Sequence, residues 1–374
     1  MNGRIPQYQA HYAKQGGDKL INIGIDVHKR RCVATLKDSS RQILQQITFD
    51  NDSDGITKFI DSIKQRYDAA RAVCESTANY WIRLHDTLEE NGIDTILAHP
   101  AKTKIIAQAR LKNDKLDSEV LADLLRADMV CESFVPDKHY RELRNLVRTR
   151  LGLIRTRTTY KNKVHSILAK YEHHCPTYKT FSKKGIKWLK EIKLSETDRM
   201  AMDAYLDGIN TTQKQIDIFE SHMASIAQDD KRIILLMTIP GINYITALTV
   251  ISEIVDIKRF ATPEKLVSYA GLAPSQRNSG DTKKSGNITK HGSVWLRYAM
   301  VEAAHTAIQH DERINRFYSR ISARRGPQKA KVAAAKEMLV IVWHMLHNME
   351  PYRTQNHCLT QRKYKRMQRQ SKST

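Results

Sequence analysis

Short apolar runs separated by polar turns fill the chain directly after residue 19. Each run has the length of a strand and is bounded by turn-forming residues, a pattern typical of β-structure. The runs are 20–26, 32–36 and 43–49. Turn and helix-cap residues at 50–54 then precede a pattern with a helical repeat. The apolar positions of that repeat are Ile56, Phe59, Ile60 and Ile63.

Helical and strand patterns alternate in the next part of the chain. The expected elements are a strand at 71–75, a helix at 79–91, a strand at 95–98, a helix opening at Pro100 and a helix at 116–129. In the last helix, Leu121, Leu124 and Leu125 should face inward. Three strands followed by alternating helices and strands predict an α/β layer fold over 20–135.

Long helical patterns replace the strands after Pro136. Apolar residues recur at nearly a coiled-coil spacing over 138–171, and a second long helix is expected over 195–228, with Ser195 and Asp198 as a capping pair. We therefore expect a helical arm over 136–229. Its many cations agree equally well with a salt-bridged coiled coil used for dimerisation and with nucleic-acid contact. The candidate nucleic-acid contacts in the arm are Arg148, Arg155 and Lys161.

The region 230–350 is expected to be mostly α-helical. Its sequence Ile239-Pro240-Gly241-Ile242 lies between two apolar helical stretches and matches a helix-hairpin-helix. The turn of such a motif offers backbone N–H groups to a DNA phosphate, so Gly241 is a candidate contact. An ordinary turn between helices would also contain Pro-Gly. The last segment, 351–374, is basic without any acidic residue, and such tails are usually disordered.

The charge of the chain indicates a polyanionic partner. Lys and Arg number 62 against 40 Asp and Glu, a formal net charge of +22. This excess is larger than solubility requires. Because each neutralised phosphate releases counterions, nucleic acid is the expected partner.

Cysteine usage and hydropathy indicate a cytoplasmic protein without a membrane partner. The five cysteines are scattered and form no Cys-x-x-Cys pair, so the sequence indicates neither a zinc ribbon nor a disulfide framework. No apolar stretch approaches the ~20 residues that span a bilayer. Residues 1–19, which we expect to be a flexible arm, lack the apolar core of a signal peptide.

Four carboxylates stand where a metal-dependent nuclease would need them. Asp26 and Glu75 each close an apolar strand-like run, while Asp114 and Asp117 lie three residues apart at the start of a helix. A spacing of three places two side chains on one helix face. Oxygen ligands suit Mg²⁺, and two such ions can stabilise the attacking and leaving oxygens of a phosphodiester. Singly, each carboxylate is more typical of a turn or helix cap.

A glycine- and serine-rich segment over 271–292 suits a phosphate site. A serine there would need activation before it attacks phosphorus. Spacing alone does not distinguish Ser275, Ser279, Ser285 and Ser293, and a flexible surface loop is the simplest interpretation of the residues alone. The cations that we select in and near this segment are Arg277, Lys283, Lys284, Lys290 and Arg297.

Taken together, these motifs resemble the DEDD transposases of insertion sequence family 110, relatives of the Piv-type DNA invertases. The resemblance spans roughly 20–350. It rests on Gly24-Ile25-Asp26-Val27-His28-Lys29, Glu75-Ser76-Thr77, Lys112-Asn113-Asp114 with Asp117, and the Gly271–Gly280 segment. Two departures are Ser118, where the family usually has Ala, and Asn113, which replaces a common threonine.

The resemblance implies an N-terminal RuvC-like domain of ribonuclease H fold over 20–135, a coiled-coil arm over 136–229 and a transposase domain over 230–350. It assigns the metal-binding acidic residues to Asp26, Glu75, Asp114 and Asp117. It assigns the catalytic serine to Ser279 beside Gly280. The implied cofactor is Mg²⁺, with Mn²⁺ as an alternative.

The resemblance also implies a mechanism and partners. Such proteins use a non-coding bridge RNA that pairs with donor and target DNA, and they exchange strands through serine–DNA links at a Holliday-like junction. Homo-oligomers, a dimer and a tetramer in the synaptic complex, would bring the serine of one subunit to the carboxylates of another. A prokaryotic, nucleoid-associated location follows. Two alternatives remain, a hydrolytic junction resolvase of the RuvC kind and a non-catalytic nucleic-acid-binding scaffold.

Overall fold

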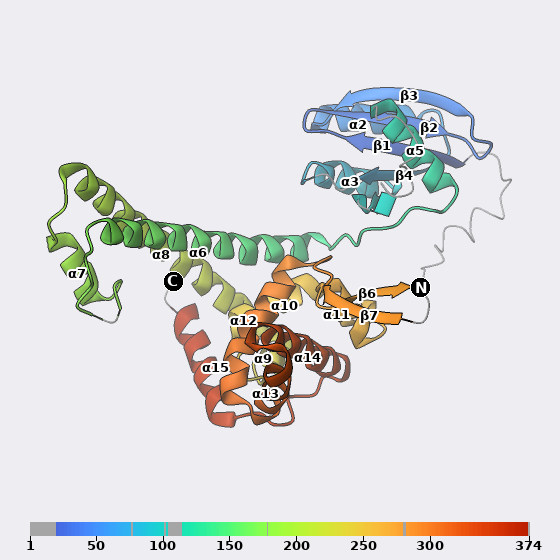
Figure 1. Cartoon of the computed structure of the whole chain (residues 1–374). Coiled ribbons are helices and arrows are strands. Elements are labelled where there is room, and N and C mark those ends of the chain that lie inside the picture. Colours follow the sequence, from blue (N-terminus) through green and yellow to red (C-terminus); the bar gives the residue numbers. More distant parts are fainter. Residues whose placement is uncertain are drawn as a thin grey trace. The chain divides into compact units, whose positions relative to one another are not determined.

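A computed structural model describes residues 20–75, 78–100, 102–103, 114–177, 179–279 and 282–372 of the chain. At 114–116, 276–279 and 282–285 it describes the backbone. The chain divides between Val135 and Pro136 into two compact units (Figure 1). The predicted arm at 1–19, most of the predicted helix after Pro100, Asn113 and Gly280 lie outside the described residues.

A five-stranded mixed sheet forms the centre of the first unit. Its strands are β1 (Leu20–Val27), β2 (Arg31–Lys37), β3 (Ile43–Asp50), β4 (Ala69–Glu75) and β5 (Asp94–Ala98). The order is β3-β2-β1-β4-β5. β2 is antiparallel to β1 and β3, whereas β4 and β5 are parallel to β1. The predicted strands and the α/β character of this region are confirmed, and the unit is consistent with a RuvC-like fold.

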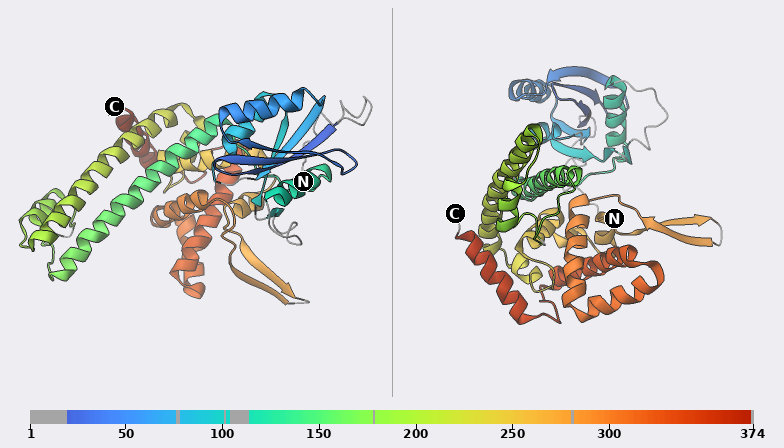
Figure 2. Two further views of the ribbon diagram at one scale, coloured as in Figure 1. Left: turned by 90° about the horizontal axis from the view of Figure 1, so that it is seen from above. Right: turned by 60° about the vertical axis from the view of Figure 1, so that its left-hand side comes forward.

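Helices cover both faces of this sheet (Figure 2). On one face, α2 (Ser53–Lys64) and α3 (Trp81–Glu90) pack against alternate residues of β1 such as Ile23 and Ile25. On the other face, α5 (Asp114–Arg126) packs through Leu121 and Leu125. The four apolar residues predicted for α2 and the three leucines predicted for α5 are all buried.

Two long helices begin the second unit. They are α6 (Lys138–Lys170) and α8 (Glu196–Asp229), and the short α7 (Lys183–Glu191) lies between them in sequence. Contacts Lys170–Asp198, Arg157–Gln213 and Arg150–Glu220 show that α6 and α8 run antiparallel. Ser195 caps α8 by accepting a hydrogen bond from Asp198 N, as predicted. The helical pair is confirmed, and coiled-coil packing stays a prediction.

The rest of the second unit is a helical body with one β-hairpin. Its helices are α9 (Lys231–Leu236), α10 (Tyr244–Ile254), η1 (Ile257–Arg259), α11 (Pro263–Tyr269), α12 (Val294–His310), α13 (Glu312–Arg325), α14 (Pro327–Asn348) and α15 (His357–Ser371). The hairpin strands are β6 (Pro274–Ser279) and β7 (Thr282–Ile288). No helix in the described part of the chain is long and apolar enough to cross a membrane.

Two expectations from the sequence are wrong at the level of secondary structure. The glycine- and serine-rich segment is a β-hairpin rather than a loop, and Figure 2 shows it extending away from the helices of its unit. The basic tail is not disordered, because α15 packs against α8 through a buried Met367. An amphipathic repeat in α15 therefore outweighs the repulsion between its cations.

Candidate functional site

The ends of β1 and β4 bring two of the predicted carboxylates to one edge of the sheet. In the parallel register Gly24 pairs with Val73 and Ile25 with Cys74. Asp26 and Glu75 are the next residue on each strand. Paired residues on adjacent strands point to the same side of a sheet, so these carboxylates lie on the α5 face, as Val73 does. The side chain of Asp26 is 15% exposed.

The start of α5 lies over the same edge. A Cβ on Gly24 would meet Ser118 O at 2.1 Å and Ala122 N at 2.3 Å, so the first turns of α5 contact the carboxyl-terminal half of β1. The other end of α5 is anchored at the amino ends of the strands, where Arg71 bonds both Asn22 Oδ1 and Leu125 O. The helix therefore runs antiparallel to β1.

The predicted helical pair consequently belongs to this edge. Asp117 precedes the buried Leu121 by four residues, and position 114 precedes it by seven, so both occupy the stripe of α5 that packs on the sheet. The structure thus places Asp26 and Glu75 on the face of the sheet that α5 covers, at the end over which α5 begins. The side chain of Asp114 lies outside the described part.

The chemistry of these residues suits a hard divalent cation, because all four side chains offer carboxylate oxygens. Among the described side chains, no three His, Cys, Asp or Glu residues are close enough together to hold a metal ion. That search did not include Asp114, the member of the set at the start of the helix. The donor type fits a metal, and the roles of the four residues stay predictions.

His28 lies beside this edge. Its Nε2 is 3.1 Å from Asp26 Oδ2, and its side chain is 50% exposed. The short turn after β1 brings this surface histidine next to Asp26. The i,i+2 spacing of Asp26 and His28 around a strand end was the available signal.

Ser118, a departure from the family pattern, has a structural partner. Its hydroxyl is buried and lies 2.8 Å from Thr35 Oγ1 on β2. Nearby, the buried Lys37 donates to Glu119 Oε1 at 3.1 Å and to Asp123 Oδ2 at 2.9 Å. These contacts fix α5 to β2 as well as to β1.

The predicted nucleophile, Ser279, is the last residue of β6. Its backbone pairs with Thr282, Asn278 pairs with Lys283, and Arg277 pairs with Lys284. Two of the predicted cations, Arg277 and Lys284, are therefore cross-strand neighbours. Like charges opposite one another destabilise a hairpin, so this arrangement favours an anionic partner.

The base of the hairpin is firmly bonded. Arg297 Nη1 donates to Ala270 O at 2.9 Å and to Lys290 O at 3.3 Å. Gly271 has φ +66°, and a Cβ there would meet His291 O at 2.5 Å. Arg297 and Lys290, predicted as nucleic-acid contacts, thus also form part of the support for the hairpin.

The arm cations chosen from the sequence have intramolecular partners. Arg148 donates to the buried Glu253 Oε1 at 2.7 Å, and its guanidinium stacks on Trp295, as does that of Arg155. Lys161 lies 5.0 Å from the ring centre of Phe181, and burial lowers its pKa. Nucleic-acid contact by these residues stays a prediction.

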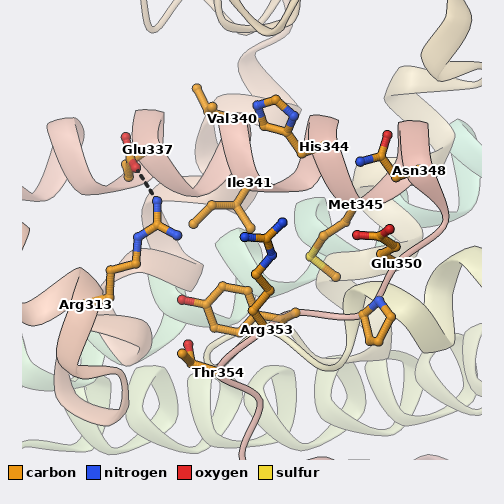
Figure 3. Close-up of a pocket in the computed structure, with 12 residues that line it drawn as sticks. Arg313, Glu337, Val340, Ile341, His344, Met345, Asn348, Glu350, Arg353 and Thr354 are labelled. Atoms are coloured by element: carbon orange, nitrogen blue, oxygen red, sulfur yellow. Dashed lines mark hydrogen bonds and ion pairs between the residues drawn. The ribbon is translucent and has the colours of Figure 1, made fainter.

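A cavity of about 340 Å³ lies beside α14 (Figure 3). Arg313 pairs with Glu337 at 3.2 Å on its wall, while Ile341 and Met345 supply apolar surface. No residue predicted as catalytic from the sequence lines this cavity.

Comparisons with known proteins agree with these observations. The family model of DEDD transposases of the IS110 type, described as transposase, matches residues 23–173. A second model, described as transposase of the IS116/IS110/IS902 family, matches residues 234–319. Together these ranges cover nearly all of the sheet with its acidic edge, the whole of α6, the Pro-Gly turn and the serine hairpin.

Three similar bacterial proteins are named as transposases or putative transposases. The transposase for insertion sequence element IS1111A of Coxiella burnetii is 28% identical over 74% of this chain and 77% of its own length. A putative transposase, y4qE, of Sinorhizobium fredii is 27% identical over 76% of this chain and 71% of its own length. The transposase for insertion sequence element IS1533 of Leptospira borgpetersenii is 25% identical over 90% and 98%. This chain belongs to the IS110 family of DEDD transposases and is a DNA transposase.

Proposed function

We propose that this transposase is an RNA-guided, Mg²⁺-dependent recombinase that cuts and exchanges DNA strands through a serine–DNA link. Two observations support the proposal. Asp26 and Glu75 end adjacent strands on the face of the sheet that α5 covers, and Ser279 is the last residue of β6 in a cation-rich hairpin. The acidic edge alone would support hydrolysis equally well. The hairpin serine favours recombination.

Asp26, Glu75, Asp114 and Asp117 would hold the metal. A bound Mg²⁺ or Mn²⁺ would neutralise charge on the phosphate and support the attacking and leaving oxygens. The close approach of α5 to β1 at Gly24 supports a position of the helical pair near the two strand ends. His28 adds a hydrogen-bonding partner to Asp26 and orients that carboxylate.

In the proposed reaction, Ser279 Oγ attacks a DNA phosphorus atom and its proton passes to a general base. The serine–phosphate ester forms as one bond from phosphorus to a deoxyribose oxygen breaks, releasing a sugar hydroxyl. A hydroxyl from the other duplex then attacks the ester, which restores the DNA phosphodiester and the serine. One phosphate ester replaces another at each step, so no external energy source is needed.

Sequence choice is proposed to come from a bridge RNA that pairs with donor and target DNA, while the protein holds backbone and shape. The net charge of +22 and the low aromatic content of 7% support backbone contact over base stacking. The proposed assembly is a dimer that becomes a tetramer in the synaptic complex, with the serine of one subunit meeting the carboxylates of another.

The test is to incubate the chain with Mg²⁺, supercoiled donor and target plasmids, and RNA transcribed from the DNA that flanks its gene. We expect recombinant product and a covalent protein–DNA adduct. Both should disappear in Ser279→Ala and in Asp26→Asn, whereas Ser275→Ala on the same strand serves as the matched control and should keep both. A hydrolytic resolvase would instead continue to cut DNA in Ser279→Ala without forming any adduct.

A further inference from the structure

The carbonyl groups of the turn between α9 and α10 converge on a single side chain from the end of the chain. Lys363 Nζ donates to Ile239 O at 2.9 Å, to Ile242 O at 2.9 Å and also to Met237 O. An ammonium group has three N–H donors, and these three acceptors use all of them. The Pro-Gly turn is therefore organised around a positive charge.

Lys363 occupies an apolar position of α15. It precedes the fully buried Met367 by four residues, on the face that packs onto the unit. The neighbouring Lys365 and Arg366 are exposed. Burial lowers the pKa of Lys363 to about 8. A half-buried ammonium is costly unless its donors are satisfied, so the carbonyl contacts account for its presence there.

The buried Lys37 shows that carbonyls are not the default partner of a lysine ammonium. Lys37 in the first unit is paired with two carboxylates. Within the described residues, Lys363 has backbone oxygens as its hydrogen-bond acceptors and no carboxylate within ion-pairing distance. Converging backbone carbonyls are the ligand type with which proteins replace the hydration shell of monovalent metal ions.

We propose that the ammonium of Lys363 is a built-in substitute for a monovalent metal ion at the Pro-Gly turn. Without it, the three carbonyls form a binding site for K⁺ or Na⁺. The charge offsets the mutual repulsion of the three oxygens and so holds the turn in shape. On its other side the turn is fixed by Gly241, which has φ +88° and where a Cβ would meet Ala303 O at 2.2 Å.

The role of Lys363 in nucleic-acid binding rests on the proposed function. The turn precedes α10, whose N-terminus is capped by Asn243 through a hydrogen bond from Thr246 N. A phosphate could dock on the turn only if the backbone of the turn already had its present shape before binding. Lys363 is thus a positioning residue for phosphate contact, and it needs no direct contact with the nucleic acid.

The experiment measures thermal unfolding of the full chain in KCl, NaCl or tetramethylammonium chloride at one ionic strength. In tetramethylammonium chloride, Lys363→Ala should melt several degrees below the parent chain. K⁺ or Na⁺ should recover much of this loss, because the shortened side chain leaves the carbonyls open to a small ion. Lys363→Met should melt low in all three salts, since its side chain fills the space. The parent chain and Lys365→Ala, the exposed control, should each melt at the same temperature in all three salts.

Two outcomes would overturn the proposal. One is a Lys363→Ala chain that is as stable as the parent chain in tetramethylammonium chloride. The other is a Lys363→Ala chain that melts at the same temperature in all three salts. If Lys363→Ala does not fold, Lys363→Gln replaces it, because its longer side chain leaves a smaller gap beside the carbonyls. The melting temperatures of Lys363→Gln in the three salts are then compared in the same way. Binding of a short DNA duplex to Lys363→Ala is measured separately. A salt-specific melting response without any change in duplex binding would uphold the ion site and reject its role in phosphate contact.

Discussion

Glycine at position 24 sets how closely α5 approaches the sheet. Any side chain there would enter the backbone of α5, since its Cβ would lie 2.1 Å from Ser118 O and 2.3 Å from Ala122 N. Both of these atoms belong to the backbone of α5, so no change of side-chain rotamer relieves the clash. The helix that carries Asp117 therefore keeps its position only if residue 24 has no side chain.

Gly24→Ala should accordingly displace α5 and reduce strand exchange, although every carboxylate is retained. We expect a loss of about 1–3 kcal/mol in the free energy of unfolding, the usual range for overpacking a core. Denaturant unfolding together with the recombination assay measures both effects.

Gly152→Ala on α6 is the matched control, because a Cβ there meets nothing within 4 Å. In a helix interior this change should stabilise the chain by roughly 0.5–1 kcal/mol and leave activity unchanged. If Gly24→Ala proved as stable and active as the parent chain, the close approach of α5 would not matter.

Ser118 shows how a departure from a family pattern can be accommodated locally. The hydroxyl is buried, and its hydrogen bond to Thr35 satisfies it. A buried hydroxyl without a partner would cost about 1–3 kcal/mol, so Thr35 and Ser118 belong together as a pair.

At the scale of elements, the antiparallel pair α6 and α8 is held by polar contacts along its length. At the far end, Asp198 accepts from Lys170 Nζ and from Tyr171 Oη, each at 2.6 Å. The hydrogen bond from Lys170, followed by that from Tyr171, holds the pKa of Asp198 at about 2, against an ordinary value of 3.8.

Because the pKa is lower in the folded state, Asp198 stabilises this end of the pair above about pH 4, and its contribution is lost as the pH falls through 2. Asp198→Asn should therefore lower protection against hydrogen exchange around 170–198 at pH 5. The difference from the parent chain should shrink as the pH approaches 2. Asp203→Asn, which breaks an exposed pair with Arg199, should change protection little at any pH. A difference independent of pH would contradict the assignment.

Elements with a strong repeat could be predicted from the sequence. The strands around Ile23 and Ile25, the apolar face of α2 and the leucines of α5 follow directly from periods of 2 and 3.6 residues. The edge that holds Asp26 and Glu75 was predictable too, since parallel strands end at the same side of a sheet.

Features that depend on distant contacts could not be predicted in this way. The hairpin at 274–288 has few apolar residues, and cross-strand pairing forms it. Helix α15 has a high charge that conceals its packed face. The half-buried ammonium of Lys363 is bound by carbonyls more than a hundred residues earlier in the chain. Likewise, the sequence around Arg148 shows no sign of Glu253, its partner on α10.

At the scale of the whole molecule, the acidic edge and the serine hairpin belong to different compact units. The proposed mechanism needs both in one reaction. It predicts that an inactive Ser279→Ala chain and an inactive Asp26→Asn chain will complement one another when mixed, because each supplies what the other lacks.

In such a mixture, each mixed dimer should have one working site, and the DNA adduct should form on the Asp26→Asn chain, which retains its serine. Differently tagged chains and mass analysis of the adduct measure this. The control is Ser279→Ala mixed with a second chain that lacks the serine. This mixture should recover no activity, because neither chain supplies the nucleophile. Absence of activity in confirmed mixed dimers would mean that serine and carboxylates act within one subunit.

The contact between Lys363 and the Pro-Gly turn joins residues 121 to 126 positions apart in the sequence. During synthesis the turn leaves the ribosome long before its cation does. A nascent chain, or one shortened after α14, would therefore have the turn without its neutralising charge. Under the proposed role of Lys363, competence to hold a phosphate at this turn is acquired only after α15 has been made and folded, when the proposed catalytic segments upstream have already been synthesised.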